Sequence, residues 1–426
     1  MLKLVHFVTS RNLVLIATNF FSGIILARLL EVTARGELAV VITWATLIST
    51  ISMLSISEII IKTESKKLNL IDILVFLVIT CLFGGVIYLI LEPLFFDENI
   101  DKYHFYFLMF IPINMLSAIF LSLLQKHKKF DKLMLVRNLF PIMNILLMII
   151  VHFTFSLNVD SVLKLYLLSN IIVFIFAISY GYEYIDISFC KVKFSEYFRK
   201  IPGFHGVTIF VVISSQVDKL IATQVLNLHD LSNFVVASAI PISIANVFVS
   251  TSQTLLLPLL NKENISNVLS TSIRIYTWYM LPLFTVGFVT LSKLITLIFG
   301  TDYLLASKIT IGVGIFYYFL IFRKSVSKSV RGFGLEVGFI YLELAYISFL
   351  LCITYTLNYI VMVSVNELIV VNLAVNFIIH IFLLLFLEHK LKLNIYSELT
   401  NFEQFKSDIG FLKVNGKKYL KSKVNR

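Results

Sequence analysis

The sequence predicts an all-α polytopic membrane protein with about twelve transmembrane helices, arranged as two six-helix lobes around a central cavity. Hydrophobic residues make up 58% of the 426 residues and charged residues only 14%, whereas soluble domains contain about 45–50% apolar and about 25% charged residues. Apolar runs of roughly 20 residues, enough to cross a ~30 Å hydrocarbon layer, recur along nearly the whole chain. Lysine and arginine residues gather in alternate connecting loops.

The membrane spans are expected to be helices, because a backbone in lipid must satisfy its own hydrogen bonds and the period-2 alternation of a barrel is absent. The apolar runs place six spans in the first half, at residues 12–30, 38–61, 71–91, 104–124, 133–155 and 162–184. Six more follow, at residues 203–226, 231–260, 273–299, 307–330, 337–357 and 365–387.

The loop charges predict the orientation in the membrane. One set of loops is basic, with Lys126, Lys128, Lys129 and Lys132 as an example, and the other set is short and acidic, as at residues 97–101. Basic loops face the cytoplasm. We therefore expect both termini in the cytoplasm, and four parts: lobe 1–185, cytoplasmic linker loop 186–202, lobe 203–387 and basic cytoplasmic tail 388–426. The net charge of +11 lies in these loops and does not indicate a nucleic-acid partner.

The two halves resemble each other weakly. The segment "LLEVTARGELAV" after the first span aligns with "VLNLHDLSNFVV" after the seventh, although unrelated helical hairpins could align as well. Six spans on each side of the basic linker give the halves the same orientation, as in a parallel repeat. This arrangement favours a transporter.

Charged residues inside the spans are the candidate functional residues. On the span 203–226, Lys219 and Gln216 lie on one polar side, and Asp218 points about 100° away. A charge near the bilayer centre is costly and usually faces the bundle interior or water. We therefore predict that Lys219 and Gln216 line a water-filled cavity with Arg28 of the first span, and that Asp218 meets a cation on another helix and is a candidate for ion coupling.

Three further residues complete the predicted substrate-binding set. Asn19 precedes Arg28 on nearly the same face of its helix, Arg137 lies near the inner end of the fifth span, and Lys293 lies in the ninth. Lys293 could instead reach the lipid headgroups. Other amides inside the spans, such as Asn138 and Asn144, are interpreted as interhelical hydrogen bonds.

An electropositive interior suits an anionic cargo, and a lipid-linked pyrophosphate is the natural candidate. The three cysteines are far apart, so neither a metal site nor a disulfide framework is predicted. The chain contains no Walker-type glycine loop, no H-E-x-x-H and no G-x-S-x-G. We therefore expect no cofactor and no enzymatic activity.

Three segments carry a family resemblance. "GIILARLLEVTARGELAVVI", "VDKLIATQVLNLHDLSNFVVASAIP" and "LITLIFGTDYLLAS" resemble segments of the polysaccharide and O-antigen flippases, in the superfamily of multidrug, oligosaccharidyl-lipid and polysaccharide exporters. Arg28, Gly36, Asp218 and Lys219 match the pattern. Glu31 and Val32 depart from it, where the family commonly has glycine and proline, as does Ser232, where a glycine is usual.

The resemblance implies a flippase that moves an undecaprenyl-pyrophosphate-linked oligosaccharide, an O-antigen or capsule repeat unit, across a bacterial inner membrane by alternating access. Its expected partners are this substrate, membrane lipids, a glycan polymerase and a chain-length regulator. Two alternatives remain. A cation-coupled drug exporter of the same superfamily would need an acidic or aromatic cavity, and a membrane enzyme such as a polymerase or acyltransferase would be expected to carry a large external loop.

Overall fold

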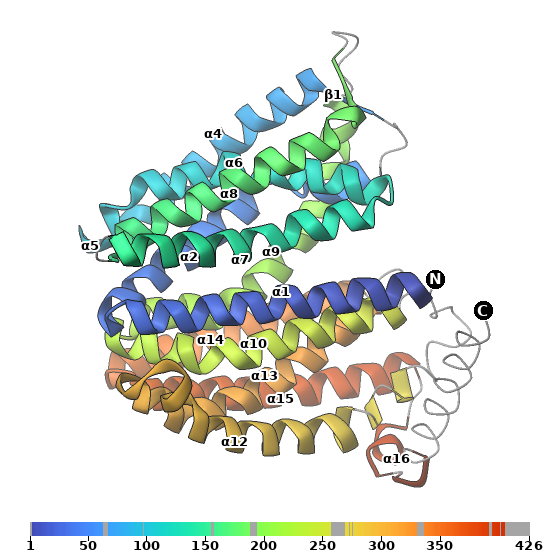
Figure 1. Cartoon of the computed structure of the whole chain (residues 1–426). Coiled ribbons are helices and arrows are strands. Elements are labelled where there is room, and N and C mark those ends of the chain that lie inside the picture. The colour runs from blue at the N-terminus through green and yellow to red at the C-terminus, as the bar shows by residue number, and fades with distance from the viewer. Residues whose placement is uncertain are drawn as a thin grey trace, which may run out of the picture.

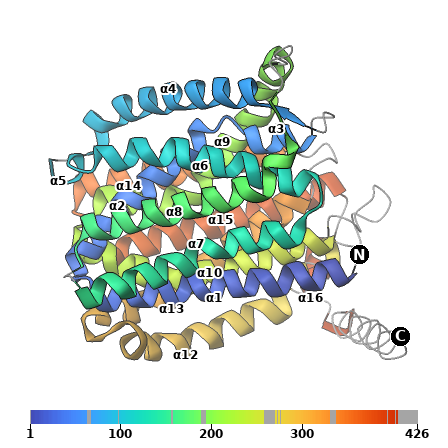
Figure 2. The same ribbon diagram turned by 45° about the horizontal axis from the view of Figure 1, so that its top comes forward.

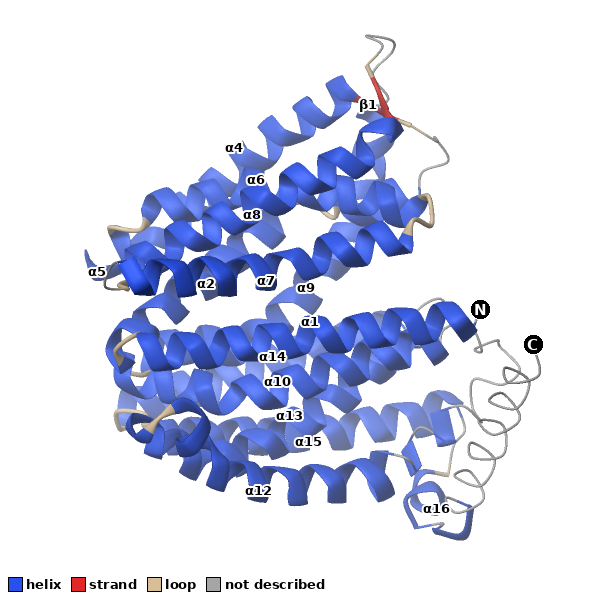
Figure 3. Ribbon diagram, in the orientation of Figure 1, coloured by secondary structure: helices blue, strands red, loops and turns tan. Residues whose placement is uncertain are grey.

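The computed structural model describes residues 2–62, 67–96, 98–154, 157–187, 194–256, 269–271, 273–274, 276–329, 336–391, 394–400 and 402–404. These residues are almost entirely helical (Figure 3). Residues 188–193 of the predicted linker, most of the predicted tail and the ends of several predicted spans lie outside them.

The first half contains eight α-helices and a short strand pair. In chain order it begins with α1 (Leu2–Leu29), α2 (Val32–Ser52), α3 (Ile56–Lys62), β1 (Leu68–Asn69), α4 (Leu70–Phe95), α5 (Glu98–Asp101), α6 (His104–Lys126) and α7 (Phe130–Thr154). The α8 helix (Val159–Gly181), the turn η1 (Tyr182–Tyr184) and β2 (Ile185–Asp186) complete this half.

The second half begins with α9 (Phe194–Val225) and α10 (Leu228–Leu256). The π-helical turn η2 (Tyr276–Met280) leads into α12 (Leu281–Phe299), and η3 (Thr301–Tyr303) leads into α13 (Leu304–Ser329). The remaining helices are α14 (Glu336–Ile360), α15 (Val365–Leu391) and the short α16 (Ile395–Thr400).

The helices confirm the predicted fold class, because each predicted span overlaps at least one helical segment of the structure. Among the described residues, 8 helices are long and apolar enough to cross a membrane. Shorter apolar segments lie at Ala17–Leu29, Leu228–Ile244 and Phe284–Phe299. Large apolar side chains on the outward face of α4, including Val78, Leu82, Val86 and Leu89, are exposed, as expected where a helix meets lipid.

The helix packing repeats between the two halves. In the first half, α1 packs on α7, α2 on α6, α6 on α8 and α7 on α8. The helices six spans later make the equivalent contacts, since α9 packs on α14, α10 on α13, α13 on α15 and α14 on α15. The equivalent helices α4 and α12 lie at opposite edges of the molecule in both views (Figures 1 and 2). This packing is the signature of a parallel internal repeat.

The two ends of the helical bundle differ. The start of α1 lies at the same end as β1, which we call the termini end, and α5 lies at the other (Figure 1). The α1–α2 and α9–α10 connections lie at this second end, which we call the hairpin end. The two halves meet directly, because α2 packs on α10, α1 on α10 and α2 on α9. At the hairpin end, Gly36 of α2 lies against the backbone of Leu228 of α10.

The second predicted span is broken into α2 and α3. The break falls at Met53–Ser55, where Leu54 and Ser55 adopt positive φ angles of 50° and 55°. Such angles are uncommon outside glycine and end a helix. The Ser55 hydroxyl lies 3.4 Å from Nδ1 of His205 on α9. The predicted continuous helix over residues 38–61 is therefore wrong at this point, which no proline or glycine marks.

A two-residue parallel strand pair was also not predicted. Leu68 pairs with Ile185 and Asn69 with Asp186, which ties the connection before α4 to the connection after α8. Asn69 also caps α4, since its side-chain oxygen accepts a hydrogen bond of 2.9 Å from the backbone N–H of Ile71.

Candidate functional site

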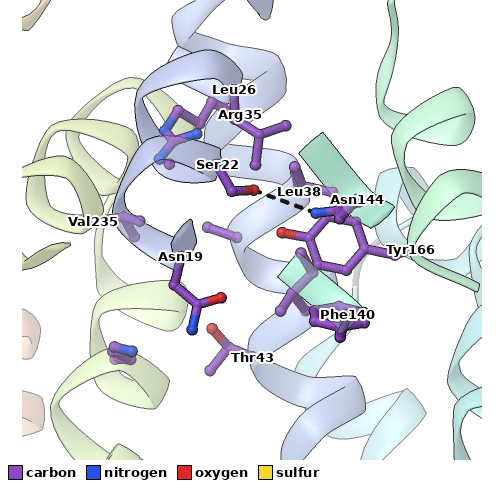
Figure 4. Close-up of a pocket in the computed structure, with 14 residues that line it drawn as sticks. Asn19, Ser22, Leu26, Arg35, Leu38, Thr43, Phe140, Asn144, Tyr166 and Val235 are labelled. Atoms are coloured by element: carbon purple, nitrogen blue, oxygen red, sulfur yellow. Dashed lines mark hydrogen bonds between the residues drawn. The ribbon is translucent and has the colours of Figure 1, made fainter. Parts of the chain in front are cut away.

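A cavity of about 210 Å³ lies where the two halves of the protein meet (Figure 4). The first half supplies most of its wall through α1, α2, α7 and α8, and the second half supplies one residue each from α9 and α10. The lining residues are Asn19, Ser22, Gly23, Leu26, Arg35, Leu38, Ala39, Ile42, Thr43, Phe140, Asn144, Tyr166, Lys219 and Val235. None of them is an aspartate or a glutamate.

Arg35 is the most unusual residue of this wall. It lies in the first turn of α2, its side chain is only 6% exposed, and its Nε atom is buried without a hydrogen-bond partner. None of the ion pairs formed by the described residues includes Arg35. A buried guanidinium without an anionic partner is costly, so this position favours a bound anion.

The nearest carboxylate along α2 is engaged elsewhere. Glu37 lies 2.7 Å from Nζ of Lys102 and accepts a hydrogen bond of 3.1 Å from the hydroxyl of Tyr103, both in the connection between α5 and α6. The hydrogen bond to Glu37 raises the pKa of Lys102. Burial and the Glu37 carboxylate raise the pKa of Tyr103 to about 12. At neutral pH, Lys102 therefore stays charged and holds Glu37 away from Arg35.

Lys219 is the second cation of the cavity, and α9 presents it from the opposite half of the chain. Its neighbour Asp218 points elsewhere, is 1% exposed, and accepts a hydrogen bond of 2.8 Å from the hydroxyl of Tyr317 on α13. Adjacent residues on a helix diverge by about 100°, so Asp218 is directed into the second half while Lys219 faces the cavity.

Polar side chains of α1, α7 and α8 face one another across the cavity (Figure 4). The side-chain N–H of Asn144 donates a hydrogen bond of 3.3 Å to the hydroxyl of Ser22. The ring of Tyr166 lies 5.7 Å from the ring of Phe140, at 67°. The cavity therefore combines two cations with uncharged polar groups and an aromatic edge.

The predicted substrate-binding residues divide into two groups. Lys219 and Asn19 line the cavity. Gln216, Arg137, Lys293 and Arg28 are not among its lining residues. Arg137 is exposed on the face of α7 that carries Phe140, about one turn closer to the termini end. Gln216 is half-buried on α9, and Lys293 is exposed on α12.

The structure places Arg28 at the end of α12. Its Nε donates a hydrogen bond of 3.0 Å to the carbonyl of Ile298, and Nη2 donates to the carbonyl of Leu297. The last carbonyls of a helix have no partner within that helix and attract cations. In this structure Arg28 therefore joins the first half to the second.

Replacing Arg28 with glutamine should lower the stability of the protein by about 1–2 kcal/mol, because charge-assisted hydrogen bonds to α12 are lost. Thermal unfolding in detergent measures this as a lower midpoint, with diphosphate affinity unchanged. Lys293→Gln, at an exposed cation of α12, is the matched control and should not shift the midpoint. An unchanged midpoint combined with lost diphosphate binding would instead make Arg28 a substrate ligand.

Sequence reasoning did not select Arg35, Asn144 or Tyr166. Arg35 stands in the quoted "TARGEL" segment, but the second span was predicted to begin at Leu38, which left Arg35 in a turn. In the structure α2 begins at Val32 and carries Arg35 inside. Asn144 was noted and interpreted as structural, and its buried side chain and hydrogen bond to Ser22 do connect α7 to α1.

Comparison with solved structures defines the class of this protein. The inward-facing conformation of a multidrug resistance MATE family transporter of the MOP superfamily matches with a TM-score of 0.60 and 14% identity, over 87% of this chain and 93% of that chain. Its outward-facing conformation matches with a TM-score of 0.55 and 14% identity, over 92% and 96% of the two chains. The protein is therefore a multi-pass membrane protein with the fold of the MATE transporters.

The family follows from the sequence profile. The profile of the family described as "Polysaccharide biosynthesis protein" matches residues 25–308, and the chain belongs to this family. This confirms the resemblance to the polysaccharide flippases of the superfamily. A MOP superfamily transporter from Pyrococcus furiosus, in which reverse polarity of the binding pocket suggests a different function, matches with a TM-score of 0.59 and 13% identity, over 92% of this chain and 96% of that chain. The search of curated proteins returned no match.

Proposed function

We propose that this protein is a flippase that moves an undecaprenyl-pyrophosphate-linked oligosaccharide from the cytoplasmic to the periplasmic leaflet of a bacterial inner membrane. The observation that carries the proposal is the buried guanidinium of Arg35, which has no ion-pair partner, in a cavity whose described lining residues include Lys219 and no carboxylate. The membership in a polysaccharide biosynthesis family supports a glycan cargo.

A diphosphate fits the charges of this cavity. An arginine presents a planar fork of donors to phosphate oxygens, and a lysine adds a point charge. Both interactions strengthen away from bulk water. Arg35 and Lys219 come from opposite halves of the chain, so one diphosphate would bridge the halves and favour the arrangement in which both cations reach it.

The closed contacts at the hairpin end support a direction of loading. Nε1 of Trp44 on α2 donates a hydrogen bond of 3.2 Å to the hydroxyl of Thr223 on α9. The side-chain N–H of Gln224 donates a bond of 3.3 Å to the carbonyl of Phe95 at the end of α4. The basic loops favour a cytoplasmic termini end. In this conformation the cavity would therefore take up its substrate from the cytoplasmic side. Release of the substrate at the hairpin end requires these contacts to break.

Asp218 is proposed as the residue that couples transport to a cation. It is buried in the second half and accepts its hydrogen bond from Tyr317. The loss of transport in Asp218→Asn, with substrate binding retained, is the expected result. Tyr317→Phe removes the hydrogen bond but keeps the Asp218 carboxylate. It therefore distinguishes the effect of losing the carboxylate on coupling from the effect of losing the contact with Tyr317 on packing.

The decisive test of the function is deletion of the gene. The expected result is accumulation of lipid-linked oligosaccharide in the inner leaflet and loss of surface glycan, both restored by the intact gene. The competing proposal is an exporter of organic cations, for which the multidrug transporters of the same fold are the argument. Its signature would be normal surface glycan together with increased cytosolic accumulation of cationic drugs, and that outcome would overturn the flippase proposal.

A further inference from the structure

Asn144, in the cavity wall that also contains Arg35, has one side-chain atom without a hydrogen-bond partner. Asn144 is 1% exposed and lines the cavity, and while its N–H donates to Ser22, its Oδ1 atom is buried without a hydrogen-bond partner. A buried carbonyl without a donor is costly. A ligand that donates a hydrogen bond at this position would satisfy it.

Two hydroxyl groups lie on the same side of the cavity. The Ser22 hydroxyl accepts from Asn144, and the side chains of Ser22 and Asn144 both donate to the hydroxyl oxygen of Tyr166, so the proton of the Tyr166 hydroxyl is the one left to be donated to a ligand. Figure 4 shows the hydroxyl of Tyr166 directed toward Ser22 and Asn144. The cavity wall therefore offers one acceptor, Oδ1 of Asn144, and one donor, the hydroxyl of Tyr166, within a small area.

An apolar surface adjoins these groups. Phe140 and Asn144 are four residues apart on α7 and share one face of that helix. The rings of Phe140 and Tyr166 pack edge to face. A methyl group of a ligand bound to Asn144 would lie against this aromatic pair.

We propose that Asn144, Ser22, Tyr166 and Phe140 form a subsite for the 2-acetamido group of the sugar attached to the diphosphate. The amide N–H of the acetamido group donates to Oδ1 of Asn144, its carbonyl accepts from the hydroxyl of Tyr166, which Ser22 holds in place, and its methyl packs on the rings. A plain 2-hydroxyl lacks the second polar atom and the methyl group. The proposal rests on the proposed function, because it assumes a sugar diphosphate in the cavity.

The position relative to Arg35 matches the chemistry of such a ligand. A Cβ atom built on Gly23 would lie 4.0 Å from Nη2 of Arg35, and Gly23 is the neighbour of Ser22 in the chain. The guanidinium and the acetamido subsite are therefore adjacent. In a sugar diphosphate the 2-acetamido group is likewise next to the anomeric carbon that carries the phosphate.

The test compares two short-chain ligands on the purified full-length protein in nanodiscs. Farnesyl-diphospho-N-acetylglucosamine and farnesyl-diphospho-glucose differ at C2 only. The wild-type protein should bind the acetamido ligand about tenfold more tightly, the effect of one or two hydrogen bonds. Asn144→Leu should bring this ratio close to one by weakening the acetamido ligand more than the glucose ligand, since the leucine side chain takes no hydrogen bond from either. Tyr166→Phe, which keeps the ring, should reduce the ratio partly.

The matched control is Asn138→Leu. Asn138 lies on the same helix, is 6% exposed, and has a buried side-chain nitrogen without a partner, but it is not among the residues that line the cavity. It should leave the ratio unchanged. Equal affinity of the wild type for the two ligands, or a preference that survives Asn144→Leu, would overturn the subsite alone. If the wild type binds neither ligand, the proposed function fails as well.

Discussion

Replacing Arg35 with glutamine is expected to lower the affinity of the cavity for a diphosphate by roughly ten- to a hundredfold and to block glycan export. A hydrogen bond between charged groups contributes about 1.5–3 kcal/mol, and tenfold in affinity corresponds to about 1.4 kcal/mol. Arg35 lies in the cavity wall, and none of the described residues beside it there is a competing carboxylate. The measurements are the Kd of farnesyl diphosphate in nanodiscs and the amount of surface glycan in a complemented deletion strain.

Arg35→Lys separates charge from geometry. It keeps the positive charge and loses the planar fork, so partial binding should remain. Arg28→Gln provides the matched arginine control, because Arg28 is bonded to α12 outside the cavity. If both glutamine variants lose diphosphate binding equally, the loss comes from weakened contact between the two halves of the protein. The role of Arg35 as a ligand would then be wrong.

Replacing Gly36 with alanine is expected to prevent closure of the hairpin end and to abolish export while the protein still inserts. A Cβ atom on Gly36 would lie 2.0 Å from the backbone oxygen of Leu228. That contact is between the backbones of α2 and α10, so no side-chain rotation relieves it, and the two helices must separate. Spin labels at the exposed positions Glu31 and Asn227, in the α1–α2 and α9–α10 connections, should report a longer distance.

Gly85→Ala is the control for this experiment. Gly85 lies on α4, and an added Cβ atom would meet nothing within 4 Å. The variant should keep both the wild-type distance between the labels and wild-type export. A Gly36→Ala protein that retains the short distance would show that α2 and α10 can shift without opening, and would contradict this account.

The fold was largely predictable because each membrane span is a local property of the sequence. A run of apolar residues is helical in lipid whatever its neighbours are, so all the predicted spans recur as helices. The break after Ser52 was not predictable, since it depends on the packing around Leu54 and Ser55 and on the contact with His205. The pairing of β1 with β2 joins segments more than a hundred residues apart and leaves no local pattern.

The candidate site was predictable only in part. Helical periodicity was enough to separate Lys219 from Asp218, because their directions follow from the helix alone. The choice between Arg28 and Arg35 required the tertiary structure. Both belong to the same quoted segment, but one reaches the end of α12 and the other the cavity, according to where α1 ends and α2 begins. The unpartnered oxygen of Asn144 likewise becomes visible only when every neighbour is placed.

The uneven origin of the cavity wall has a consequence for engineering. Among the described residues that line it, all but Lys219 and Val235 belong to the first half of the chain. A chimera that joins this first half to the second half of a relative should therefore inherit its cargo preference from the first. The exchanged half would set how transport is driven, so the two properties could be recombined independently.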